Sequence, residues 1–133
     1  MRTFRGESGS SVDVKKKLLL VEDDTVQIQI LSAKLSSSGF DVSVARDAAQ
    51  AISLARQTRP NVILLDIGLP GGGGYIVLER LKALMILIPV LALSSRPAAT
   101  ERDKMIASGA ADYFEKGVDL GVLVKRIEEL AAT

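Results

Sequence analysis

The stretch NVILLDIGLPGGGG, residues 61–74, decides the fold of this chain. Its first part is an apolar run of mostly branched side chains that ends in one carboxylate, Asp66, and a turn follows. A run of this kind is typical of a buried strand in a parallel sheet. The sequence therefore predicts a central strand over residues 61–66 that places Asp66 at the rim of the sheet.

Three other short apolar runs also end in polar side chains. They are LLLV at 18–21, which precedes Glu22, Asp23 and Asp24; VLAL at 90–93, which precedes Ser94; and YFE at 113–115, which precedes Lys116. Parallel strands end at the same edge of a sheet, and ligands of open α/β sheets bind outside that edge. We therefore expect carboxylates, a hydroxyl and an ammonium group to gather there.

Composition narrows the classes of function. The chain has 133 residues, enough for one domain, with 47% apolar residues, 25% charged residues and a net charge of +1. It has neither Cys nor His, which excludes disulfides, thiolate or imidazole metal sites and Ser-His-Asp catalysis. The near-neutral charge gives no reason to expect nucleic acid or a membrane as a partner. No run is apolar enough for a signal peptide or long enough to span a membrane, so the expected location is the cytoplasm.

Strands and helices alternate along most of the chain. Residues 1–14 are predicted to be a disordered tail or an expression remnant, and residues 15–133 one domain. The predicted strands cover 18–21, 40–44, 61–66, 86–93 and 113–115, and the predicted helices cover 25–37, 48–58, 75–84, 98–107 and 120–131. Such alternation indicates parallel strands with right-handed crossovers. The predicted fold is α/β, a doubly wound five-stranded parallel sheet in the order 2-1-3-4-5 with five helices.

In this strand order Glu22 and Asp23 face Asp66 across neighbouring strands. Three close carboxylates repel one another unless a cation lies among them, and an all-oxygen site suits Mg²⁺. With the charge neutralised, Asp66 can act as a nucleophile toward a phosphoryl group, whose oxygens Lys116 and Ser94 would hold. Taken singly, each of these residues is more simply a helix cap, a turn residue or an edge-strand charge. Their combination at strand ends is what favours a site.

The motifs LLLVEDD (18–24), NVILLDIGLPGGGGY (61–75), VLALSS (90–95) and ADYFEK (111–116) together resemble a known family. The chain is similar, over about residues 15–131, to the CheY-like, flavodoxin-like receiver domain of bacterial two-component response regulators. The resemblance implies that Asp66 accepts a phosphoryl group from the phosphohistidine of a sensor histidine kinase or phosphotransfer protein. It further implies a signalling switch rather than a turnover enzyme.

The resemblance also assigns expected roles to single residues. Asp23, Asp66 and the backbone carbonyl of Gly68 would ligate Mg²⁺, and Glu22 would act largely through bound water. Ser94 and Lys116 would contact the phosphoryl group, and Tyr113 matches the aromatic residue that turns inward when Ser94 is drawn toward the phosphate. The fourth helix, fifth strand and fifth helix would form the surface that meets an output partner or domain.

The chain departs from the family pattern in three places. Gly117 follows Lys116 where the family usually has a proline in a cis peptide; because a non-proline cis bond costs roughly 3 kcal/mol, we expect a trans or strained link and a less firmly placed lysine. The loop at 71–74 is all glycine, which predicts unusual flexibility. Gly68 and Arg96 occupy positions that influence the lifetime of the phosphoryl group in the family.

Two other functions compete with the switch. A non-switching pseudo-receiver that serves as a protein–protein scaffold is suggested by Gly117 and by the glycine loop, and Mg²⁺ binding would distinguish it. A phosphatase of the haloacid dehalogenase type would also form an aspartyl phosphate. Such enzymes need a second acid two residues after the nucleophile, where this chain has Gly68.

Overall fold

Five parallel strands form the central sheet, in the order β4-β3-β5-β6-β7. The computed structural model describes residues 3–5, 11–13 and 15–132. The strands of the sheet are β3 Lys17–Val21, β4 Asp41–Ala45, β5 Val62–Asp66, β6 Val90–Ser94 and β7 Asp112–Glu115. The α-helices are α1 Thr25–Ser37, α2 Ala48–Thr58, α3 Gly73–Ala83, α4 Ala98–Ala107 and α5 Leu120–Ala131. Counted along the chain, the strand order within this sheet is 2-1-3-4-5, so the predicted fold is confirmed.

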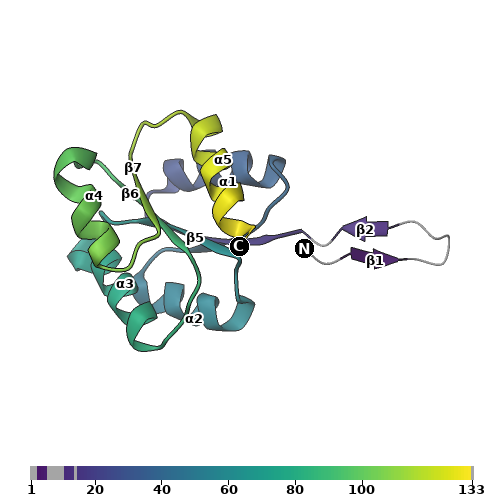
Figure 1. Ribbon diagram of the computed structural model, residues 1–133, viewed down its shortest axis with the longest axis horizontal. Coiled ribbons are helices and arrows are strands. Elements are labelled where there is room, and N and C mark those ends of the chain that lie inside the picture. Colours follow the sequence, from purple (N-terminus) through teal and green to yellow (C-terminus); the bar gives the residue numbers. More distant parts are fainter. Residues whose placement is uncertain (1–2, 6–10, 14, 133) are drawn as a thin grey trace.

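The helices cover both faces of the sheet (Figure 1). Alternate side chains of the inner strands point to opposite faces, so that Leu18, Leu20 and Leu64 pack with α1 and α5, while Leu19, Ile63 and Leu65 pack with α2 and α3. All residues of β5 are buried, as expected for the middle strand of a parallel sheet. None of the helices in the described part of the chain is long and apolar enough to cross a membrane.

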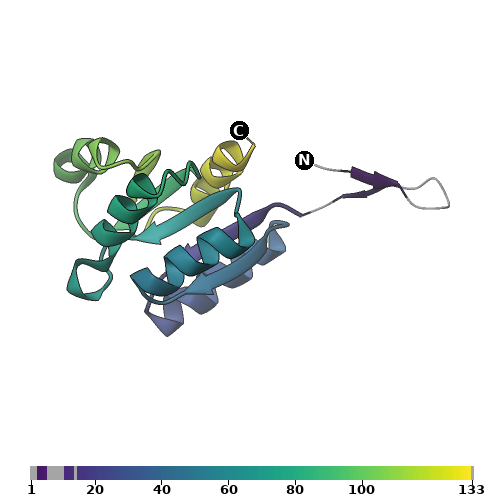
Figure 2. The same cartoon turned by 90° about the horizontal axis from the view of Figure 1, so that it is seen from below.

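A short hairpin precedes the sheet. Strand β1, Thr3–Arg5, pairs antiparallel with β2, Ser11–Asp13. The pair extends from the end of the sheet at which β3 begins (Figures 1 and 2). The sequence did not predict these strands. Residues 1–2, 6–10 and 14 lie outside the described residues, so the disordered tail stays a prediction for them.

Local sequence signals set several of the helix ends. Three aspartates accept a hydrogen bond from a backbone N–H in the first turn of α1, α2 and α5, respectively Asp24 from Gln27, Asp47 from Gln50 and Asp119 from Val122. Gly39 and Gly109, which closely follow α1 and α4, have φ values of +98° and +112°, the left-handed conformation that ends many helices. The aspartates mark where α1, α2 and α5 begin. The glycines mark where α1 and α4 end, and the next strand follows soon after each of them.

Two predicted boundaries were wrong. The strand predicted over 86–93 begins only at Val90, and Leu87 is 91% exposed in the preceding loop. Pro89 lacks an N–H for the sheet, and Met85 has a φ of +56°, so the chain turns here before it pairs. The helix predicted over 75–84 begins at Gly73, after a 3₁₀ turn, η1, over Pro70–Gly72.

Candidate functional site

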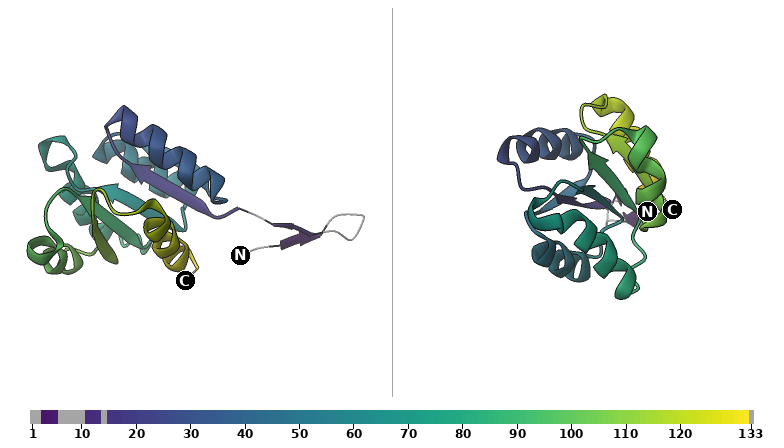
Figure 3. Two further views of the ribbon diagram at one scale, coloured as in Figure 1. Left: turned by 90° about the horizontal axis from the view of Figure 1, so that it is seen from above. Right: turned by 90° about the vertical axis from the view of Figure 1, so that its left-hand side faces the viewer.

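Three carboxylates meet at the end of the sheet opposite the hairpin, the end that Figure 3 (right) faces. Asp66 is the last residue of β5, and Glu22 directly follows the neighbouring strand β3. Glu22, Asp23 and Asp66 each offer an oxygen that lies within 4.8 Å of the other two. Glu22 is 1% and Asp66 4% exposed, whereas Asp23 faces solvent. The sheet topology therefore assembles the predicted acidic cluster.

Glu22 is held in place by the backbone. Its Oε2 accepts hydrogen bonds from the N–H groups of Asp23 at 3.1 Å and Asp24 at 3.3 Å. Burial, together with the hydrogen bond and negative charge of Asp66, raises the pKa of Glu22 to about 7. A buried carboxyl group whose charge is disfavoured by burial and by a neighbouring carboxylate belongs to a pocket that favours a cation.

Lys116 supplies a positive charge within the pocket. Its Nζ lies 3.1 Å from Asp66 Oδ2 and 3.8 Å from Glu22 Oε1. Burial lowers the pKa of the Lys116 ammonium, but the hydrogen bond and charge of Asp66, with the charges of Glu22 and Asp23, together outweigh burial and leave this pKa raised. The Lys116–Gly117 peptide is trans, one of the two expected forms, with a Gly117 φ of +93°. The ammonium contacts Asp66 directly, and the expectation of a less firmly placed lysine stays a prediction.

Gly68 and Ser94 flank the acceptor in different ways. The Gly68 N–H donates to Asp66 Oδ1 at 2.9 Å, which orients the carboxylate. Ser94 ends β6, the strand beside β5, and is buried. Its Oγ accepts a hydrogen bond from the Arg96 N–H at 3.2 Å. Ser94 thus lies at the predicted edge, with its hydroxyl engaged by the loop that follows β6.

Tyr113 lies inside the protein. Its side chain is 0% exposed, and its hydroxyl donates to the carbonyl oxygen of Arg96. Although β7 is an edge strand of the sheet, this aromatic side chain is therefore fully buried rather than half-buried. Because the N–H of Arg96 binds Ser94 and its carbonyl binds Tyr113, the backbone of one residue bridges the hydroxyl and the aromatic ring. The sequence analysis noted Arg96 only for its side chain and missed this bridge.

The donors of the cluster fit Mg²⁺. All are oxygen atoms, two of the three carboxylates are buried, and neither His nor Cys is present to favour a softer metal. Neutralisation by a divalent cation also relieves the electrostatic conflict that raises the pKa of Glu22. The acidic pocket is therefore suited to hold a metal ion.

One more buried acid escaped the sequence analysis. Asp112, the first residue of β7, is 5% exposed and accepts from Arg102 and Arg126. Asp112 is 10 residues from Arg102 and 14 from Arg126 in the sequence, so no local pattern indicates that these side chains are in contact. A charged residue that opens a strand inside an otherwise apolar segment was the available signal.

Comparison with known proteins agrees with this geometry. The family model described as the response regulator receiver domain matches residues 18–128. The chain belongs to this receiver family. A receiver domain from a Francisella response regulator, 1452, matches with a TM-score of 0.83 and 28% identity over 88% of this chain and 97% of that one. The BeF3-activated receiver domain of Klebsiella pneumoniae RstA matches with a TM-score of 0.82 and 27% identity over 89% and 100%.

Curated relatives of this receiver domain are longer proteins. The transcriptional regulatory protein PrrA of Mycobacterium leprae is 39% identical over 114 residues, which are 86% of this chain and 49% of PrrA. The response regulator PleD of Caulobacter vibrioides is 32% identical over 86% of this chain and 26% of PleD. The receiver chain thus spans about half or less of the length of these relatives.

Proposed function

We propose that this receiver domain is a phosphorylation switch that accepts a phosphoryl group at Asp66. The observation that carries the proposal is the position of Asp66, buried between the acids Glu22 and Asp23 and 3.1 Å from the ammonium of Lys116. The proposed donor is the phosphohistidine of a sensor histidine kinase or of a phosphotransfer protein. Family membership supports a kinase partner in general.

The proposed transfer exchanges one bond for another. An Oδ of Asp66 forms a bond to phosphorus while the bond from phosphorus to the donor imidazole nitrogen breaks, and its electron pair stays on that nitrogen. The Gly68 N–H holds Oδ1 of Asp66, and Lys116 is positioned to bind a phosphoryl oxygen by charge and hydrogen bond. Lys116 then exchanges a carboxylate partner for a phosphoryl partner.

In the proposed switch, the acidic cluster of Glu22, Asp23 and Asp66 binds the Mg²⁺ that phosphoryl transfer requires. Asp23, Asp66 and the Gly68 carbonyl would hold Mg²⁺ directly, with Glu22 acting through water. Bound Mg²⁺ would neutralise the pocket and stabilise charge on the transferred oxygens.

The proposed readout passes through the end of β6. A phosphoryl group on Asp66 would draw the Ser94 hydroxyl away from the Arg96 N–H, and Tyr113 would respond because its hydroxyl binds the same residue. The output partner or domain would meet the face of α4, β7 and α5. We propose a switch rather than a turnover enzyme, acting in the cytoplasm and without direct contact to nucleic acid or membrane.

The test is the intact mass of the protein after incubation with acetyl phosphate and Mg²⁺. We expect a mass gain of one phosphoryl group in the parent protein and none in Asp66→Asn. The neutral amide of asparagine lacks the carboxylate oxygen that would attack phosphorus. Removal of Mg²⁺ with EDTA should suppress the gain. Asp24→Asn is a matched control, since Asp24 caps α1 outside the cluster and this variant should still gain the group.

If no mass gain is found, either the phosphoryl group is lost too quickly to be detected or Asp66 does not accept one. One further measurement distinguishes these two explanations. Rapid hydrolysis would remove the phosphoryl group before detection, whereas BeF₃⁻ with Mg²⁺ forms a stable mimic on an aspartate acceptor. Binding of that mimic by the parent and not by Asp66→Asn would retain the switch. Failure of both experiments would refute it in favour of the non-switching scaffold.

A further inference from the structure

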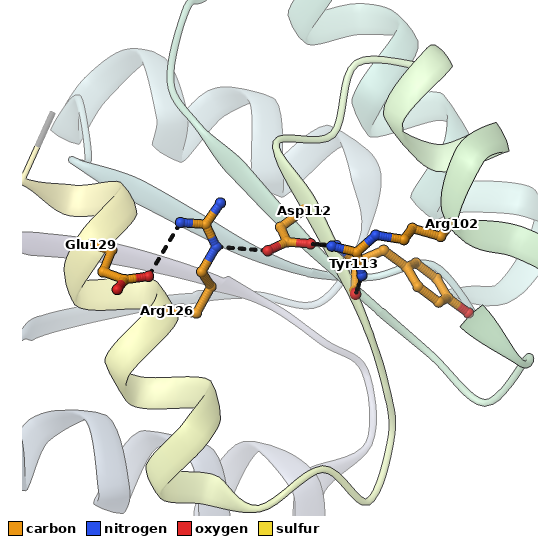
Figure 4. Close-up of polar contacts among 5 residues, drawn as sticks. All are labelled: Arg102, Asp112, Tyr113, Arg126 and Glu129. Carbon is orange, nitrogen blue, oxygen red and sulfur yellow. Dashed lines mark hydrogen bonds and ion pairs between the residues drawn. The ribbon is translucent and has the colours of Figure 1, made fainter. Parts of the chain in front are cut away.

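A chain of ion pairs crosses the face of α4, β7 and α5 (Figure 4). Asp112 lies at its centre, with Arg102 of α4 on Oδ1 and Arg126 of α5 on Oδ2 at 2.6 Å. Arg126 also binds Glu129 at 3.2 Å. The charges alternate along the chain, and one buried carboxylate connects two helices on either side of the strand that carries Tyr113.

The two arginines differ in what they bind. One guanidinium nitrogen of Arg102 binds Asp112, and the other donates to the carbonyl oxygen of Tyr113 at 3.0 Å. Asp112 Oδ1 in turn accepts from the Tyr113 N–H at 2.7 Å. Both backbone polar groups of Tyr113 are therefore held by the Arg102–Asp112 pair. The Arg126 guanidinium instead donates to the carboxylates of Asp112 and Glu129.

Helix α4 depends on polar contacts for its position. Met105 is its one buried side chain, so apolar packing holds it weakly. Two polar contacts also connect α4 to β7. The Arg102 guanidinium binds both Asp112 and the Tyr113 carbonyl, a pair of contacts called the Arg102 fork below, and the Ala98 N–H donates to Glu115 at 2.7 Å. Arg102 therefore links the backbone of Tyr113 directly to α4.

We infer that Arg102 and Asp112 are positioning residues that hold Tyr113 inward and couple it to α4, while Arg126 only anchors the same carboxylate to α5. The inference rests on the proposed function, in which Tyr113 reports the state of Asp66. The Arg102 side chain is 46% exposed and that of Asp112 only 7%, so the arginine is free to swing into solvent when β7 moves. The fork is thus a releasable contact between the switch residue and the output face.

The test reads the Tyr113 ring directly, by ¹³C-aromatic NMR of selectively labelled tyrosine. The chain has two tyrosines, so a Tyr75→Phe background leaves Tyr113 as the sole signal. Phenylalanine retains the ring that Lys104 covers at 5.3 Å. In unphosphorylated protein we expect Arg102→Gln and Asp112→Asn each to raise the population of the outward ring at least fivefold over the parent.

Arg126→Gln is the matched control because, like Arg102→Gln, it removes one positive charge that lies beside the Asp112 carboxylate. It should leave the Tyr113 signal as in the parent, since Arg102 still forks between Asp112 and the Tyr113 carbonyl. Arg102→Lys should not restore the parent signal, because one ammonium does not reproduce the planar fork of two donors. Equal changes in Arg102→Gln and Arg126→Gln, or no change in either, would overturn the inference.

The populations of the inward and outward Tyr113 ring are measured in unphosphorylated protein and do not depend on phosphorylation. Circular dichroism of each variant establishes that it folds, and the intact-mass assay with acetyl phosphate is run in parallel. A parent that takes no phosphoryl group refutes the proposed function, while the ring populations still decide whether Arg102 and Asp112 position Tyr113. Normal phosphorylation with an unmoved ring in Arg102→Gln refutes the inference alone.

Discussion

Replacing Gly74 by alanine is expected to lower the free energy of unfolding by about 2 to 4 kcal/mol. A Cβ at this position would lie 2.5 Å from the Cα and 2.6 Å from the carbonyl oxygen of Ile67. Both are backbone atoms and have no rotamer by which to move away. Helix propensity predicts the opposite sign, since alanine is favoured over glycine by about 1 kcal/mol inside a helix. Steric overlap exceeds that preference, so the sign of the change tests the packing.

The same substitution should disturb the candidate site. Ile67 follows Asp66, and its N–H donates to the Leu93 carbonyl at 2.8 Å, so displacing its backbone shifts the acceptor. Urea unfolding followed by circular dichroism measures the loss. Gly71→Ala is the control, because Gly71 has a φ of +66° and, apart from Gly71 and its two chain neighbours, no described residue has an atom within 4 Å of where its Cβ would be. Its cost should be only about 1 to 2 kcal/mol, from backbone strain; a Gly74→Ala variant as stable as the parent would refute the close approach.

The glycine run shows a limit of sequence reasoning. Four identical residues predicted one flexible loop, but Gly71 and Gly72 adopt positive φ while Gly73 and Gly74 begin α3. Only Gly74 would bring a Cβ against backbone atoms of another segment. Such a requirement comes from a contact between segments and leaves no trace in the identity of neighbouring residues.

Features that depend on local pattern were predictable, and features that depend on distant contacts were not. The apolar pattern located the helices, and the acids at strand ends located the pocket because topology alone brings strand ends together. Apolar character misled at Leu87, which is 91% exposed, because a hydrophobic residue can also lie in a loop. The full burial of Tyr113 in this structure and the pairing of Asp112 depend on contacts with α4 and α5, which no local pattern in the sequence indicates.

Glu22→Gln is expected to stabilise the metal-free protein at pH 8 by about 1 to 3 kcal/mol. The pKa of Glu22 is raised from 4.5 to about 7 in the folded protein, chiefly by burial and then by Asp66. Between these values the unfolded chain releases the proton while the folded protein retains it. Parent stability should therefore fall as the pH rises from 4.5 to 7, and above pH 7 the full cost of the ionised carboxylate remains. Glutamine removes that cost.

The measurement is the free energy of unfolding in urea from pH 4.5 to pH 8 in EDTA, compared for parent and variant. The two proteins should be closest at the acid end and diverge toward pH 8, with the variant the more stable. Added Mg²⁺ should then raise the stability of the parent at pH 8 more than that of Glu22→Gln, because cation binding is linked to ionisation of the cluster. Parallel pH profiles would mean that Glu22 carries no such cost. The acids of this pocket would then be stable together without a metal, and the electrostatic reason for Mg²⁺ binding would be lost.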